Sequence, residues 1–358
     1  MKVEILAKSC AAAALAAAFL APGAVSAESI TVVSFGGSYG DAQRQAFLAP
    51  FQQESGIETN MVDYSGGLGE VRAQVETGNV TWDVMDVEMQ DLVRGCDDGL
   101  FEDVTDIALP PAPDGIPASE DFIDGTLHEC GVGTIIWSTI IAYNDEMFPR
   151  EKPSKMEDFF DLERFPGKRG LMKKPQAFLE WALIADGVEA DKVYDVLATP
   201  EGLDRAFAKL DTIRDSIVWW DAHAQAPQLL ADKEVSMTMA ANGRIYSAIV
   251  DEGKPFRFIW DREIWVQEFW AIPKGAPDLD ASRKFIAFAS RPEQMAVLSG
   301  VISYGPARKS AAATVSDKMR PYLPTEAANF ATAIHNDVEF WADHGDEINR
   351  KFLVWLNG

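Results

Sequence analysis

The sequence is poor in histidine, cysteine and positive charge. Its 358 residues include 4 His, 3 Cys and 32 Lys or Arg, against 56 Asp or Glu, so the formal net charge is −24. A nucleic-acid partner needs a concentrated basic surface, and this balance therefore argues against one. The four histidines are scattered along the chain, so no cluster predicts a metal site, and we expect no metal and no cofactor.

Long apolar runs are also scarce. The only candidate is Ala11–Ala21, which follows the basic residues Lys2 and Lys8 and precedes small residues at Val25-Ser26-Ala27. This run is too short for a membrane-spanning helix, but it is typical of an export signal. We therefore expect residues 1–27 to be a signal peptide that is cleaved after Ala27, and the mature protein to act in the periplasm.

Export changes how the cysteines are interpreted. Removal of the signal peptide takes away Cys10 and leaves Cys96 and Cys130. An even pair of cysteines in an oxidising compartment favours a disulfide. The alternative is a pair of buried thiols in one lobe.

Evidence for catalysis is weak. The chain has no H-E-x-x-H or Walker sequence, and the acids of 82–88 lack the glycine and spacing of an EF-hand calcium loop. His223 lies close to Asp221, but two polar neighbours define no catalytic geometry. We therefore predict a protein that is not an enzyme. A secreted hydrolase on an α/β frame is the alternative class, and it needs a nucleophile, a base and an oxyanion site that converge in one cleft.

The first hundred residues show alternating strand and helix patterns. Ile30–Phe35 is a β-rich run that ends in the glycine loop 36–40, and an amphipathic helix is predicted from Asp41. Strands are predicted again at 58–64 and 82–88, with a helix over 89–97 after the second of them. Farther along the chain we predict helices over 178–185, 326–345 and 346–356, a strand over 217–220 and a tight turn at 304–306. Repeated units of this length predict a parallel α/β sheet. Ligands of such sheets bind at the carboxyl ends of the strands, so Phe35, Gly37, Ser38 and Tyr39 become candidate contacts, with plain loop packing as the alternative.

The stretch Phe258–Pro273 combines aromatic rings with carboxylates. It contains Trp260, Trp265 and Trp270, and acids including Glu268 lie among them. Ring faces beside negative charge attract an organic cation. The same composition also describes an ordinary strand with a buried apolar face.

Several segments resemble periplasmic solute-binding proteins of ABC importers, and most of all the spermidine/putrescine-binding group. The matching segments are S-F-G-G-S-Y-G-D-A-Q-R-Q-A-F-L-A-P-F-Q-Q-E-S-G-I (34–57), W-D-V-M-D-V-E (82–88), G-L-F-E-D-V (99–104), I-I-A-Y-N (140–144), F-P-G-K-R-G (165–170), F-W-A-I-P-K-G-A (269–276) and S-Y-G-P-A-R-K (303–309). The resemblance implies a two-lobed α/β fold of type II with a ligand cleft between the lobes, a monomer, and a membrane permease as partner. Lobe one would comprise 28–138 and 267–315, and lobe two 139–266 and 316–358.

The resemblance also implies a set of ligand contacts, in which Glu268 falls on a carboxylate that binds amines. The full set of candidates is Phe35, Gly37, Ser38, Tyr39, Glu88, Trp137, Asp221, Trp260, Trp265, Glu268 and Tyr304.

Other positions depart from the polyamine-binding pattern. Lys174 and Ala177 stand where the family has two acids, and Ala241 and Val266 stand where it has tryptophans. These changes argue against a long diamine held at both ends. We expect a small organic cation, nominally putrescine or spermidine, with a zwitterion such as a betaine or an amino acid as the alternative. A zwitterion would place its acid end on Lys174 or on the amides of the glycine loop.

Overall fold

A computed structural model describes residues 28–358, so the expected signal peptide lies outside the described residues. The chain forms one mixed sheet of 11 strands, whose central path runs β2-β1-β3-β9-β5-β8-β6-β7. These strands are β1 Ser29–Ser34, β2 Glu58–Asp63, β3 Val84–Glu88, β5 Gly131–Asn144, β6 Arg169–Met172, β7 Ile217–Trp220, β8 Met237–Ala241 and β9 Phe256–Ala271. Three short strands pair beside this path: β4 Leu127–His128, β10 Gly305–Pro306 and β11 Ile334–His335.

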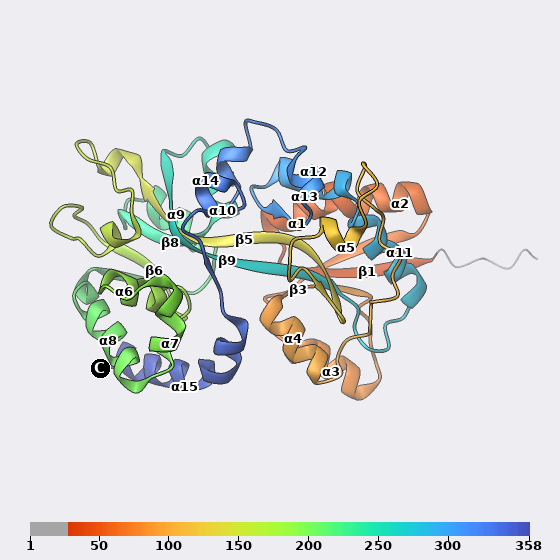
Figure 1. The fold of residues 1–358 in the computed structure, drawn as a ribbon, viewed down its shortest axis with the longest axis horizontal. Coiled ribbons are helices and arrows are strands. Elements are labelled where there is room, and N and C mark those ends of the chain that lie inside the picture. Colours follow the sequence, from red (N-terminus) through yellow and green to blue (C-terminus); the bar gives the residue numbers. More distant parts are fainter. Residues whose placement is uncertain (1–27) are drawn as a thin grey trace, which may run out of the picture.

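Strands β5 and β9 join the two halves of the molecule. They pair antiparallel over almost their whole lengths of 14 and 16 residues and run across the centre of Figure 1. Nearly every side chain of β5 is buried, in keeping with its β-branched composition. On one side of this pair β1, β2 and β3 are parallel, and on the other β6, β7 and β8 are parallel. The predicted parallel arrangement is therefore right within each half, while β5 and β9 make the whole sheet mixed.

Helices cover the sheet in both halves (Figure 1). The first half has α1 Gly37–Gln43, a π-helical turn Arg44–Leu48, α2 Ala49–Ser55, α3 Gly69–Thr77, α4 Met89–Asp97, α5 Ala118–Asp121, α11 Leu279–Ala289, α12 Pro292–Val301 and α13 Lys309–Ala312. The other half has α6 Phe178–Ala185, α7 Val193–Leu197, α8 Pro200–Asp211, α9 Gln225–Ala231, α10 Asn242–Val250, α14 Ala327–Phe330 and α15 Val338–Asn357. Short 3₁₀ turns lie at Asp145–Met147, Met156–Phe159, Ala190–Lys192, Arg214–Ser216 and Arg320–Tyr322.

The apolar core is divided in the same way. One cluster collects buried residues between 140 and 264 together with 334–352. Two others collect residues between 30 and 137 together with 266–311, and they include Ala241 at the end of β8. The protein is therefore a two-lobed α/β fold. Across residues 28–358, no helix has the length and apolar character needed to cross a bilayer.

The predicted disulfide is confirmed. Cys96 in α4 and Cys130, just before β5, are bonded with a Cα–Cα distance of 5.9 Å. His128 lies beside them, and its Nδ1 accepts a hydrogen bond from the Cys130 amide at 3.2 Å. Because both sulfurs are engaged in the disulfide, they offer no thiolate to a metal ion.

Four predicted elements are wrong in their bounds or type. The first helix begins at Gly37 instead of Asp41, because Gly36 and Gly37 adopt positive φ angles of 62° and 58° and turn the chain early. Gly305–Pro306 was expected in a tight turn but pairs with β5 as β10. The two helices expected over 326–345 and 346–356 are replaced by α14, β11 and the single 20-residue helix α15.

Candidate functional site

A cleft of about 550 Å³ lies between the two lobes and shares several lining residues with a side chamber of about 120 Å³. Side chains at or just beyond the ends of β1, β2, β3, β6, β7 and β8 line it. In open α/β sheets the carboxyl ends of parallel strands are where ligands bind. The position of this cleft therefore follows from the sheet topology.

Four aromatic rings stand on the lobe-one wall of the cleft. Phe35 follows β1 and packs on Tyr64, which follows β2, with ring centroids 4.9 Å apart. Tyr39 in α1 meets Tyr304 edge-on at 5.2 Å. Aromatic pairs of this kind are rigid and apolar, so they can enclose the methylene groups or the ammonium of a small ligand.

Three carboxyl groups lie on one face of β3 and β9: Glu88 and Glu268 line the floor of the cleft, and Asp86 is fully buried next to them. Glu88 and Glu268 are directly opposite each other in the antiparallel ladder, and Asp86 lies two residues along β3 on the same face. Asp86 Oδ2 accepts hydrogen bonds from Ser34 Oγ at 3.1 Å and from Gln43 Nε2 at 2.5 Å. Asp86 and Glu268 are buried, whereas Glu88 is half-buried.

Burial and mutual repulsion make these acids hard to ionise. Burial raises the pKa of Asp86 to about 6, against the lowering effect of its hydrogen bonds. Burial, helped by the neighbouring Asp91, raises the pKa of Glu88 to about 7. Burial, together with the charges of Asp86 and Glu88, raises the pKa of Glu268 well above its ordinary value. A positive group in the cleft would favour the ionised forms of all three.

Basic side chains occupy the opposite wall. Lys174 follows β6, and Arg244 lies in the first turn of α10, just after β8. Arg244 reaches across to lobe one, where its Nη1 lies 3.5 Å from Ser38 Oγ. A Cβ on Gly37 would lie 2.5 Å from the same nitrogen, so a side chain at this position would make the guanidinium shift, and the φ of 58° also favours glycine. Asp221 also lines this wall, but it is paired with Lys173 at 3.1 Å. Lys174 and Arg244 therefore make this end of the cleft basic, opposite the acidic floor.

His223 and Trp137 stand between these two ends. Trp137 projects from β5, and its ring meets the His223 imidazole edge-on at 5.9 Å. Burial, with Arg244 and Lys174 nearby, lowers the pKa of His223 to about 4. The imidazole is therefore neutral at pH 7 and adds no charge to the basic wall.

The structure brings most of the predicted contacts together. Those lining the cleft are Phe35, Tyr39, Glu88, Trp137, Asp221, Glu268 and Tyr304. Gly37 and Ser38 border it through Arg244. The positions that depart from the polyamine pattern, Lys174, Ala177, Ala241 and Val266, also line the cleft or its side chamber.

The structure does not bring Trp260 and Trp265 into the cleft. Trp260 stacks on Phe258 at 4.9 Å. Trp265 lies against His335 at 4.1 Å and Phe330 at 5.4 Å. Residues 264 and 266 line the side chamber, and because side chains alternate along a strand, residue 265 points to the other face. These two rings therefore pack within lobe two and cannot replace the missing tryptophans.

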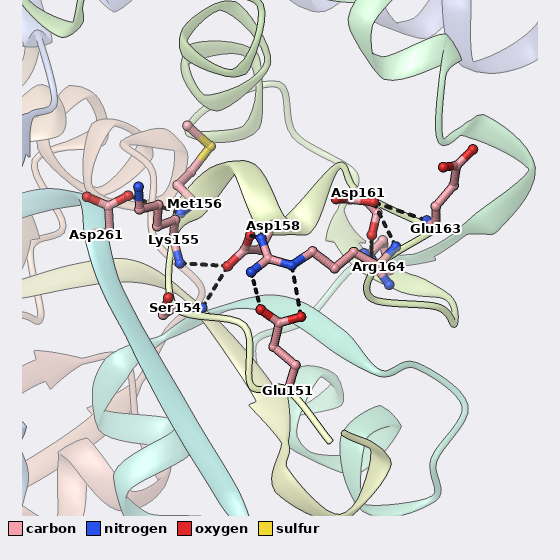
Figure 2. A network of polar contacts seen from close by, with 10 residues as sticks. Glu151, Ser154, Lys155, Met156, Asp158, Asp161, Glu163, Arg164 and Asp261 are labelled. Atoms are coloured by element: carbon pink, nitrogen blue, oxygen red, sulfur yellow. Dashed lines mark hydrogen bonds and ion pairs between the residues drawn. The ribbon is translucent and has the colours of Figure 1, made fainter. Parts of the chain in front are cut away.

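Asp261, another acid of the same stretch, also has a structural role. Its Oδ2 accepts a hydrogen bond from the Met156 amide at 3.1 Å, which fastens β9 to the loop before β6. Figure 2 shows this loop, in which Asp158 accepts bonds from the amides of residues 154 and 155 and Arg164 pairs with Glu151. The cluster stabilises the loop and lies outside the lining of the cleft.

Two site residues were missed as ligand contacts from the sequence. Asp86 was considered only as a calcium ligand, although it alternates with Glu88 on a strand that ends at the cleft. Arg244 was not among the candidate contacts, although it follows the carboxyl end of β8. The available signal in both cases was the same rule that identified Phe35 and Tyr39, namely the position at a strand end.

Ser38 tests the alternative of a hydrolase. Gly36–Gly40 has the G-x-S-x-G spacing of a nucleophile elbow and joins a strand to a helix. Within residues 28–358, however, the hydrogen bonds of Ser38 Oγ include one with Arg244 and none with a histidine. An arginine cannot act as the general base that such a serine needs.

Comparisons with known proteins identify the family. The sequence pattern of the bacterial extracellular solute-binding proteins matches residues 46–325. The chain belongs to this family. A gamma-aminobutyric acid (GABA)-binding protein of Pseudomonas aeruginosa is 45% identical over 338 residues, which are 94% of each chain.

Solved structures agree with this assignment. An ABC transporter substrate-binding protein from Bradyrhizobium japonicum is 35% identical with a TM-score of 0.82, covering 92% of this chain and 99% of its own. A GABA receptor is 32% identical with a TM-score of 0.77, covering 92% and 98%. The protein is therefore a solute-binding component of an ABC transporter. In the periplasm it binds its solute and works with the membrane permease of the transporter. It is not an enzyme.

The expected polyamine subgroup is not supported to the same degree. A spermidine/putrescine-binding protein from Streptococcus pneumoniae is 14% identical, with a TM-score of 0.71 and coverage of 92% and 100%. A likeness at this identity shows the shared fold alone. The predicted family is confirmed, whereas the polyamine specificity is not.

Proposed function

We propose that this protein captures a small zwitterion with separated amino and acid groups, of which GABA is the model, and delivers it to its permease. The observation that carries the proposal is the opposite charge of the two cleft walls. The ammonium would lie at Glu88 and Glu268, with the buried Asp86 adding negative charge behind them, and the carboxylate would lie on Arg244 and Lys174. The 45% identity to a GABA-binding protein supports the same ligand class.

A diamine fits this charge pattern less well. Its second ammonium would approach Arg244 and Lys174, and like charges in a partly desolvated cleft repel each other. The arginine can instead hold a carboxylate with two parallel hydrogen bonds. The charge pattern therefore favours the zwitterion over putrescine and spermidine.

We further propose that capture involves hinged closure of the predicted lobes, 28–138 with 267–315 over 139–266 with 316–358. Strands β5 and β9 cross between these lobes. A ligand that contacts the acids of one lobe and the bases of the other gains contacts only when the lobes are close. Such a ligand shifts the population towards the closed form. Binding and release then require no covalent chemistry, and we expect the protein to act as a monomer.

Isothermal titration calorimetry with GABA, putrescine and glycine betaine tests the ligand class. We expect GABA to bind at least tenfold more tightly than putrescine. Arg244→Gln should weaken GABA binding by about 10- to 100-fold, because a charge-assisted hydrogen bond contributes roughly 1.5–3 kcal/mol. Arg257→Gln, at an exposed arginine of β9, is the matched control and should bind normally.

Two results would contradict the proposal. Tighter binding of putrescine than of GABA would assign the cleft to polyamines. Unchanged GABA affinity in Arg244→Gln would remove this arginine from the carboxylate end.

A further inference from the structure

The acidic floor of the cleft contains more carboxyl groups than a single ammonium needs. Asp86, Glu88 and Glu268 share one face of two paired strands, with Glu88 and Glu268 directly opposite each other. Like charges directly opposite in a ladder are destabilising, and here two of the three groups are also removed from water. The ligand-free floor is therefore poorly suited to hold three negative charges at once.

The hydrogen-bond donors around Asp86 do not neutralise the negative charge of the floor. Asp86 receives hydrogen bonds from the neutral groups of Ser34 and Gln43. Among the described residues 28–358, Asp86 Oδ1, Glu268 Oε2 and the Tyr39 hydroxyl have no hydrogen-bond partner. These atoms are buried and close together, because the Tyr39 hydroxyl faces both carboxyl groups and Asp86 faces Glu268. A proton shared between the two carboxyl groups would supply a missing hydrogen bond and remove one of two facing negative charges.

Other titratable groups around the floor are of fixed charge near neutral pH. Burial raises the pKa values of Tyr39, Tyr64 and Tyr304 above their ordinary value, so these phenols stay protonated. Asp91, which follows in α4, adds negative charge towards Glu88. Lys174 is the cation that acts on Glu88, from the opposite lobe.

We propose that the trio Asp86, Glu88 and Glu268 holds at least one proton in the ligand-free protein at neutral pH, and that the incoming ammonium expels this proton to the solvent. The inference rests on the proposed function, because it requires a ligand with an ammonium group. The charge balance is simple: one positive charge enters the floor and one proton leaves it. The floor thus keeps a nearly constant total charge in both states.

The direction of the pH dependence follows from linkage. The free trio contains groups with pKa values of about 6 and about 7, and Glu268 lies higher still. A bound ammonium lowers these pKa values, so the complex holds fewer protons than the free protein. Affinity should then rise with pH across this range, by up to about tenfold per pH unit for one released proton. The ligand itself contributes little, because an alkyl amine titrates near 10 and a carboxyl group near 4.

Titration of GABA at pH 7 in buffers of different ionisation enthalpy counts the protons directly. The apparent binding enthalpies measured in phosphate and in Tris should differ by the number of protons released multiplied by the difference between the two buffer ionisation enthalpies. We expect roughly half to one proton to be released per ligand bound. Glu268→Gln should reduce this number, because it removes the group that holds a proton most strongly. The double variant Glu88→Gln/Glu268→Gln should reduce it towards zero, because Glu88 has a pKa of about 7 and still holds part of a proton at pH 7. Glu76→Gln, at an exposed glutamate of α3, is the matched control and should release as many protons as the wild type.

His223 is the main competing source of a proton signal. A carboxylate arriving at Arg244 and Lys174 would favour the imidazolium, so His223 would take up a proton instead of releasing one. His223→Gln should therefore leave the release intact or increase it.

The outcomes separate the two proposals. GABA binding with equal enthalpies in all buffers, or with net proton uptake, overturns proton release while the proposed function stands. Undiminished release in the double variant Glu88→Gln/Glu268→Gln removes the trio as the source. Absence of GABA binding at every pH from 6 to 8 overturns the proposed function, and proton release falls with it.

Discussion

Among the ion pairs of residues 28–358, the pair of Arg308 with Asp121 contains the most deeply buried cation. It shows how a single residue can stabilise lobe one. Its Nε lies 2.6 Å from Asp121 Oδ2, and its Nη1 donates to the carbonyls of Pro110 at 2.8 Å and Ser290 at 2.9 Å. Arg308→Met should lower the free energy of unfolding by about 3–5 kcal/mol, because it leaves the buried Asp121 carboxylate unpaired. Urea denaturation measures this loss.

A double variant provides the control for Arg308. Arg308→Met combined with Asp121→Leu removes both charges and should recover part of the lost stability. A loss below about 1 kcal/mol in the single variant would mean that the pair contributes no more than an exposed salt bridge.

Individual site residues differed in how far the sequence could identify them. Tyr39 could be recognised because it lies in the glycine loop after the first strand. Glu268 could be recognised because it lies in the stretch Phe258–Pro273, which combines aromatic rings with carboxylates. Trp260 and Trp265 were misassigned, because their composition suited a cation cage but their strand faces turn them into lobe two. The position of Arg244 just after β8 was a usable signal for the cleft, whereas its approach to Ser38 in α1 depends on the packing of the two lobes, and no local pattern encodes that approach.

At the scale of the element, two helical glycines should respond oppositely to the same substitution. In α15, a Cβ on Gly345 would have Trp341 as its nearest neighbour at 3.7 Å, an ordinary contact. Gly345→Ala should therefore raise the free energy of unfolding by about 0.5–1 kcal/mol. In α10, a Cβ on Gly243 would lie 2.4 Å from the Tyr304 ring, so Gly243→Ala should lower it by about 1–3 kcal/mol through overpacking.

Chemical denaturation and GABA titration distinguish these two glycines further. Because Tyr304 lines the cleft, Gly243→Ala should also weaken GABA binding, whereas Gly345→Ala should not. Equal effects of both substitutions on stability would show that the local space around each glycine does not determine the outcome.

Elements with strong local patterns were predicted with correct bounds. Met89–Asp97, Phe178–Ala185 and Ile217–Trp220 match the structure in full. The segment 326–345 did not, because Ile334 and His335 pair with Ile264 and Trp265, some 70 positions earlier in the chain. A helical periodicity read locally cannot include the free energy of pairing with a distant strand.

At the scale of the whole molecule, residues far apart in sequence meet because β5 and β9 each belong to both lobes. This arrangement places acids from β3 and β9 opposite bases that follow β6 and β8. The two-lobed fold could be predicted from the family resemblance. The separation of charge across the cleft depends on both lobes together, and no single segment of the sequence displays it.

The excess of acidic over basic residues lowers the stability of the entire protein. With 56 acidic and 32 basic residues, repulsion among unpaired carboxylates opposes the compact state. Salt screens this repulsion, since the Debye length falls from about 30 Å at 0.01 M to about 8 Å at 0.15 M. Salt also weakens exposed ion pairs such as Lys351–Glu347, but each of these contributes only about 0–1 kcal/mol.

The repulsion should therefore dominate the response to salt. Differential scanning calorimetry of the ligand-free protein should show Tm rising by roughly 1–2 °C between 0.01 M and 0.15 M NaCl, the shift that about 1 kcal/mol produces in a chain of this length. Sucrose at equal osmolality is the control for effects that do not depend on charge. A fall in Tm on adding salt would mean that ion pairs outweigh the net repulsion, and that the acidic surface is balanced locally despite the total charge of −24.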